Sequence, residues 1–85
     1  MNADTELQRG LAMMKSATPD GNTCPRNEEE WAKAVAATEQ MGFAMYLKMG
    51  VTKEQARALA RITHGGRAGR LLLQTAQQAD RERHD

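Results

Sequence analysis

The sequence predicts an all-α protein, a small helical domain of four to five helices. Signals for β-strands are nearly absent, because the 85 residues include only two valines, one isoleucine and no alternating β-branched run. Apolar residues instead recur every three or four positions in several stretches, which is the spacing of an amphipathic helix. A chain of this length forms one domain with a modest core.

Residues 1–26 are expected to form a short helix followed by a loop. Asp4 or Thr5 can cap a helix that runs to about Lys15. The apolar residues that share one side of this helix are Leu7, Leu11 and Met14. Residues 18–27 hold both prolines, a glycine and two asparagines, which is typical of a loop.

Cys24 is the only cysteine, so no disulfide can form within the chain. A lone thiol favours a reducing compartment, and we interpret Cys24 as chemically incidental. The sequence shows no basic and apolar signal peptide and no apolar run near about 18 residues. We therefore expect a soluble protein of the cytoplasm, without membrane association.

The segment 27–66 is expected to be the core of the domain. Asn27 followed by three glutamates predicts a capped helix start. Trp31, the only tryptophan, is predicted to be the main core anchor of this helix. Gly42 leaves two alternatives, a single helix over 28–49 or a break. Because glycine costs about 1 kcal/mol relative to alanine inside a helix, we favour the break or a kink.

Residues 41–62 show the pattern of a helix-turn-helix. Gly50 stands where a helix end needs a left-handed backbone, and Thr52 follows as a natural N-cap with Gln55 in the first turn. The buried side of the second helix is predicted to be Val51, Ala56 and Leu59. Tyr46 departs from the motif, which usually has a small residue four positions before the turn glycine. An ordinary helical hairpin with an arginine-rich exterior is the alternative.

Residues 67–85 are expected to form a last helix with a frayed end. His64, Gly65 and Gly66 predict the stop of the preceding helix. Three consecutive leucines from Leu71 cannot all face one side, so one of them is a candidate contact with a second subunit. We place the expected homodimer contact in 67–80, with the N-terminal helix as the alternative.

Charge is distributed unevenly along the chain. Residues 1–43 carry four positive and seven negative side chains, whereas residues 44–85 carry eight positive and four negative ones. From Lys48 to Arg70, six cations face a single acid, Glu54. Such a cluster attracts phosphates, and its coincidence with the turn motif favours DNA as the partner.

Eight residues are candidate contacts with a double-stranded DNA operator. Residues on the second helix of the motif are expected to read bases, namely Thr52, Lys53, Glu54, Arg57 and Arg61. Flanking cations are expected to contact phosphates, namely Lys48, Arg67 and Arg70.

No arrangement of side chains suggests catalysis or metal binding. His64 and His84 are the only histidines, and neither pairs with Cys24 at metal-ligand spacing. The stretch HGGRAGR matches no phosphate-binding loop and follows no strand. We expect a protein that is not an enzyme and needs no cofactor, metal or small-molecule ligand.

The chain resembles the KorC family of small repressors of broad-host-range plasmids. The residues that carry the resemblance are EEEWAKAVAATEQMGF and MGVTKEQARALAR, about the central half of the chain. The resemblance implies a dimeric transcriptional repressor of the bacterial cytoplasm that binds palindromic operators and limits the expression of plasmid maintenance genes. Its transfer to residues is confined to Gly50 and the helix from Thr52 to Arg61.

Two further functions fit the same composition. Six methionines and few aromatic residues suit an adaptable apolar face, so a small inhibitor of a host protein complex is the alternative from another class. A non-specific architectural DNA binder would show the same dependence on charge without preference for any sequence.

Overall fold

A computed structural model describes residues 2–18 and 25–84, and the described residues form four helices without a strand. These are α1 (Ala3–Ala17), α2 (Glu28–Lys48), α3 (Lys53–His64) and α4 (Gly66–His84). The predicted all-α domain of four to five helices is therefore confirmed, with four. Cys24 lies outside the described residues.

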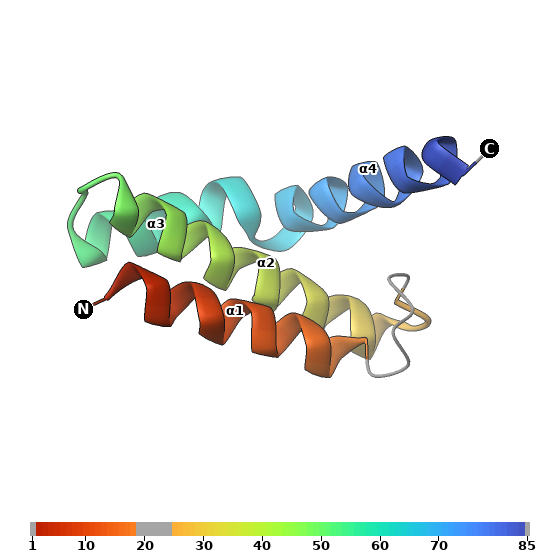
Figure 1. The fold of residues 1–85 in the computed structure, drawn as a ribbon, viewed down its shortest axis with the longest axis horizontal. Helices are drawn as coiled ribbons and strands as arrows, with labels where there is room; N and C mark the ends of the chain where they lie inside the picture. The colour runs from red at the N-terminus through yellow and green to blue at the C-terminus, as the bar shows by residue number, and fades with distance from the viewer. Residues whose placement is uncertain (1, 19–24, 85) are drawn as a thin grey trace.

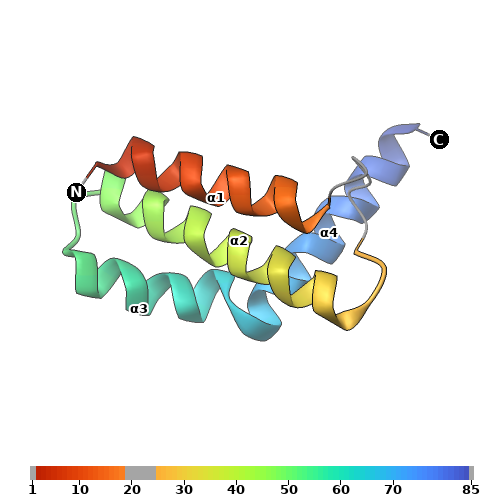
Figure 2. The same ribbon diagram turned by 90° about the horizontal axis from the view of Figure 1, so that it is seen from below.

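The helix α2 is the centre of the arrangement. The helix α1 runs antiparallel to α2 on one side, and α3 runs antiparallel to α2 on the other (Figures 1 and 2). The helix α4 continues from α3 and packs on the first half of α2 before it projects beyond the other helices (Figure 1).

Side-chain caps fix the starts of α1 and α2. The carboxamide oxygen of Asn2 accepts a hydrogen bond from the backbone N–H of Asp4 at 2.9 Å, so the cap of α1 is Asn2 and the prediction of Asp4 or Thr5 is wrong by two or three residues. Asn27 caps α2 as predicted, accepting from the N–H of Glu30 at 2.9 Å. Short polar side chains before each helix satisfy amides that have no partner within the helix.

The helix α2 continues through Gly42, so the predicted break is wrong. The reason is the packing of α3, because a Cβ atom on Gly42 would lie 2.5 Å from Cγ of His64. The missing side chain lets the two helices approach closely, and this contact offsets the cost of glycine within the helix.

Small residues dominate the core. Phe43 is the only large side chain that is fully buried in the described part of the chain, and it forms a buried cluster with Ala56 and Ala60 of α3. Ala37 and Ala44 of α2 are buried as well. Trp31 is only half-buried, so the prediction that it anchors the core is wrong.

The buried side of α1 is also different from the predicted one. Leu7 and Leu11 are exposed, whereas Glu6, Gly10 and Ala17 are buried. Gly10 lies so close to α2 that a Cβ atom there would be 2.6 Å from Cγ of Met41. The helix packs through its smallest residues, and its leucines are left at the edge of the contact.

Candidate nucleic-acid interface

The turn between α2 and α3 has the local structure that the sequence predicts. Gly50 has a φ of 95°, the left-handed conformation that glycine adopts at least cost. The hydroxyl of Thr52 accepts from the N–H of Gln55 at 3.1 Å, and the Gln55 carboxamide accepts from the N–H of Thr52 at 3.1 Å. This reciprocal pair is a capping box, which fixes the start of α3.

The two helices do not cross as in a helix-turn-helix, where the angle is about 90–120°. Gly42 lies about 9 Å before the end of α2 and His64 about 16 Å after the start of α3, at about 1.5 Å per residue. Crossed helices would hold these positions far apart, yet His64 packs directly on Gly42. Glu39 and Gly65 continue the contact. The arrangement is the helical hairpin that the sequence left as the alternative.

Tyr46 explains part of this arrangement. Its hydroxyl is 3.1 Å from Oγ1 of Thr63, and its ring meets the ring of His64 edge to face at 6.0 Å between centroids. Both contacts join the last turns of α2 to the last turn of α3. A tyrosine at the position where the motif usually has a small residue thus holds α3 alongside α2.

Four predicted contact residues lie together at the end of the hairpin. Lys48, Thr52, Lys53 and Glu54 are exposed around the turn between α2 and α3. Neither lysine makes an ion pair with a described residue. The N-terminal end of α3 adds a partial positive charge to these side chains.

Arg57 points inward, so the prediction that it is exposed for base contact is wrong. Its guanidinium carbon lies 3.6 Å from the centroid of the Phe43 ring, within the range of a cation–π contact. One guanidinium N–H donates to the side-chain oxygen of Gln40 at 3.1 Å. Of the predicted buried residues on this helix, Ala56 is buried, whereas Leu59 lies at the edge of the contact and is exposed.

A buried hydrogen-bond chain extends this contact to α1. Gln40 donates to the backbone carbonyl of Glu6 at 3.0 Å and to its carboxylate at 2.7 Å. Glu6 is only 5% exposed, and Arg9 lies 3.6 Å from the carboxylate. The sequence pattern predicted no role for Glu6 or Gln40, although each is a polar residue on a packed face of its helix. The chain Glu6–Gln40–Arg57 ties three helices together.

The other predicted cations lie around the junction of α3 and α4. Arg61 and Arg67 are exposed, and neither pairs with an acid among the residues that the structure describes. Arg70 is different, because its guanidinium donates twice to the Glu28 carboxylate, at 2.9 and 3.1 Å, and lies 4.5 Å above the Trp31 ring. The guanidinium of Arg70, which the sequence predicts to contact a phosphate, is therefore already paired with a carboxylate.

The pair between Arg70 and Glu28 shifts both groups. Hydrogen bonds from Arg70, with its charge, lower the pKa of Glu28, and the same hydrogen bonds raise the pKa of Arg70. Because the pKa of Glu28 is lower in the folded chain, the pair stabilises the fold above the ordinary glutamate pKa of about 4.5 and is lost as the pH falls through the folded value.

We therefore expect Glu28→Gln to reduce the acid sensitivity of α4 packing. Trp31 fluorescence reports this contact directly, since Arg70 lies on its ring. Below about pH 4.5, the wild-type unfolding midpoint should fall more steeply than that of the variant. Arg70→Gln should flatten the curve in the same way. Equal steepness in all three proteins would show that the pair does not contribute.

No family model, curated protein or solved structure matches the chain. Within the described ranges, no cluster of three or more histidine, cysteine or acidic side chains is placed to hold a metal ion. None of the described helices has the length and apolar character needed to cross a membrane.

Proposed function

We propose that the protein is a sequence-specific DNA-binding repressor that acts as a dimer on palindromic operators. The observation that supports this proposal is a set of exposed cations without an acidic partner among the described residues, namely Lys48, Lys53, Arg61 and Arg67. Unpaired cations are available to release the counterions of a phosphate backbone. Control of plasmid maintenance genes is the part that rests on the resemblance to KorC repressors.

In this proposal the end of the hairpin enters the major groove. Thr52, Lys53 and Glu54 stand at the N-terminus of α3, where a reading helix presents its side chains to base edges. Arg61 contributes from the same helix, and Lys48 and Arg67 contact phosphates. Arg57 and Arg70 are left out of the interface, because each is held by contacts within the protein.

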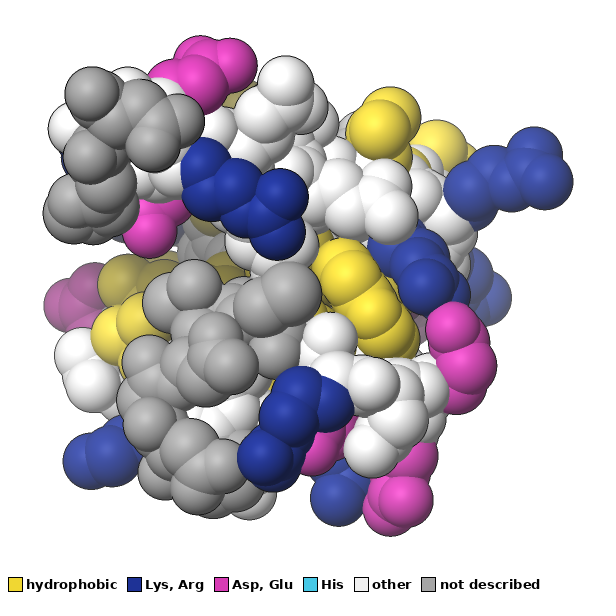
Figure 3. Space-filling view, turned by 90° about the vertical axis from the view of Figure 1, so that its right-hand side faces the viewer, with side chains coloured by type: hydrophobic (Ala, Val, Ile, Leu, Met, Phe, Trp, Pro, Cys, Tyr) yellow, Lys and Arg dark blue, Asp and Glu magenta, His cyan; other side chains and the backbone are white. Residues whose placement is uncertain are grey.

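At the other end of the molecule, cations and acids are mixed. Figure 3 views the end near the start of α2 and the end of α4, and it shows Lys and Arg interspersed with Asp and Glu. The electrostatic potentials of opposite charges that lie side by side cancel at a distance. This end is therefore a poor candidate for contact with DNA.

The proposal predicts a graded response to loss of single cations. Lys53→Ala should weaken operator binding by about 1–3 kcal/mol and relax preference at one base position. Arg67→Ala should weaken binding to all sequences alike and lower the slope of log K against log salt by about one. Fluorescence anisotropy with an operator selected from a random duplex pool measures both effects.

The matched control is Lys33→Ala. Lys33 is an exposed cation near the start of α2, 3.6 Å from the Glu29 carboxylate. This variant should bind as the wild type does, with an unchanged salt slope. Equal losses from Lys33→Ala and Arg67→Ala would mean that only net charge matters, and a pool without enriched sequences would favour an architectural DNA binder.

A second candidate function is an inhibitor that binds another protein. The observation in its favour is a groove of about 420 Å³ between α1 and α2, whose apolar lining includes Leu7, Met41 and Met45. Methionine adapts its shape to different partners. No binding to any duplex at low salt would favour this candidate over the repressor.

A further inference from the structure

Two small residues fix the rotation of α3 about its axis. Ala56 and Ala60 are fully buried, and they form a cluster with Phe43 of α2. Successive residues of an α-helix are about 100° apart, so Ala58 lies on the side opposite to this buried pair. Ala58 is exposed, as this geometry requires. The centre of the outer side of α3 is therefore an alanine that is not among the residues predicted to contact DNA.

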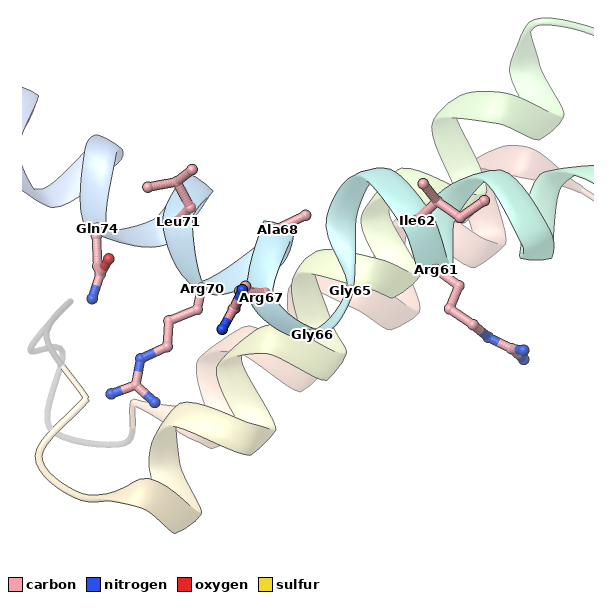
Figure 4. A pocket seen from close by; sticks show the side chains of 9 residues that line it. All are labelled: Arg61, Ile62, Gly65, Gly66, Arg67, Ala68, Arg70, Leu71 and Gln74. Carbon is pink, nitrogen blue, oxygen red and sulfur yellow. The ribbon is translucent and has the colours of Figure 1, made fainter.

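Three further side chains share this outer side. Glu54 lies one turn before Ala58, and Arg61 and Ile62 lie one turn after it. All three are exposed, and Ile62, at 72%, is the most exposed large apolar side chain in the described part of the chain. Figure 4 shows Arg61 and Ile62 pointing to opposite sides of the same turn. The outer surface of α3, defined by Glu54, Ala58, Arg61 and Ile62, thus has a charged edge and an aliphatic edge.

The other described helices leave this surface open. The helix α2 lies on the opposite side of α3 and separates it from α1, which makes no contact with α3 among the described residues (Figure 2). The helix α4 starts at Gly66, beyond Ile62, and turns toward the first half of α2. The outer surface of α3 is therefore available to a partner from Glu54 to Ile62, a length of about 12 Å at 1.5 Å per residue.

The composition of the outer surface of α3 favours DNA over a protein partner. The core of a protein–protein interface is depleted of charged residues and enriched in aromatic ones, whereas this surface has two charged residues and no aromatic one. Arg61 has no acidic partner among the described residues, so its charge is available to the negative groove of DNA. The small side chain of Ala58 allows the helix to approach base edges closely. A helix about 10–12 Å wide also fits a major groove about 12 Å wide.

We propose that Ala58 and Ile62 select thymine by contacting its C5-methyl group in the major groove. This step rests on the proposed function, since it takes α3 to lie in that groove. Among the four bases only thymine presents a methyl group there, and apolar side chains such as alanine are suited to contact it. Ala58 and Ile62 are about 6 Å apart along the helix axis, which corresponds to about two base-pair steps of 3.4 Å. The two side chains thus contact two positions of one half-site, beside the base that Arg61 reads.

The test replaces thymine by deoxyuridine, which pairs in the same way and lacks only the C5-methyl group. Each thymine of an operator selected from the random duplex pool is replaced in turn, and the dissociation constant is measured by fluorescence anisotropy. For the wild type, replacement at one or two positions of each half-site should weaken binding about fourfold, the effect of losing one buried methyl group.

Two variants assign this effect to residues. Ala58→Gly and Ile62→Ala should each bind the thymine duplex and the deoxyuridine duplex equally well at one of these positions. The readout is the ratio of two affinities of the same variant, so a change in helix stability cancels. The matched control, Leu11→Ala, removes an exposed leucine from α1 and should keep the fourfold ratio.

Three results would overturn the inference, and only the last of them also refutes the proposed function. An enriched operator whose affinity no deoxyuridine changes would exclude the reading of methyl groups and leave the repressor function in place. Unchanged ratios in both Ala58→Gly and Ile62→Ala would assign the methyl contacts to other residues. A pool without any enriched operator would refute sequence-specific repression, and with it the selection of thymine.

Discussion

Phe43→Ala should lower the free energy of unfolding by about 3–5 kcal/mol, the usual cost of removing a buried aromatic ring. Phe43 is the only large side chain that is fully buried in the described part of the chain, and its buried neighbours are Ala56 and Ala60. Alanines cannot collapse far into the vacated space. Small single domains have only about 5 kcal/mol or little more in total, so this variant should be largely unfolded at room temperature.

Urea denaturation followed by circular dichroism measures this loss. The ring of Phe43 both fills the core and makes a cation–π contact with Arg57, and Phe43→Leu separates these two roles. Leucine fills much of the same space, so this variant should lose mainly the cation–π contact, which contributes about 0.5–2 kcal/mol. Leu11→Ala, at an exposed position, should change stability by no more than about 0.5 kcal/mol. A loss at Phe43 as small as that at Leu11 would mean that the core lies elsewhere.

Local features of the fold follow from the sequence because they depend on neighbouring residues. Asn27 caps α2, and Thr52 with Gln55 forms the capping box of α3. Gly50 takes the left-handed conformation that ends α2, and Gly65 follows the last residue of α3. Each of these interactions spans no more than a few residues, so the sequence alone contains the information needed to predict it.

The packing faces could not be predicted in the same way. Gly10 and Gly42 appear unfavourable within helices, and their value becomes evident only when Met41 and His64 are seen against them. Trp31 is large and apolar enough to anchor a core, yet α4 reaches it with an arginine and leaves it half-buried. Contacts between residues far apart in the sequence decide these cases.

In the candidate interface, too, some residues lie where the sequence predicts and others are placed by contacts between distant residues. Lys48, Lys53, Arg61 and Arg67 are exposed as expected of residues near a turn or on an outer helix face. Arg57 has the same chemistry but sits above Phe43 and within reach of Gln40. Helical spacing predicts which side of a helix a residue lies on. An arginine at the border between the buried and the exposed side can extend its long side chain toward the core or toward solvent.

Gln40→Met should destabilise the protein by about 2–4 kcal/mol, although methionine matches glutamine in size. The variant loses three hydrogen bonds, two to Glu6 and one from Arg57. The Glu6 carboxylate remains buried, with Arg9 at 3.6 Å as its remaining ion-pair partner. A buried charge that loses hydrogen bonds costs more than the bonds contribute on balance. Thermal and urea unfolding measure the loss.

A double-mutant cycle identifies its cause. If the buried charge is responsible, Glu6→Leu combined with Gln40→Met should be more stable than the sum of the two single losses by about 0.5–3 kcal/mol. Additive losses would show instead that Gln40 acts through packing alone. Hydrogen exchange of α1 amides distinguishes the same alternatives, because weakening the contact between Glu6 and Gln40 should release α1 before the hairpin of α2 and α3 unfolds.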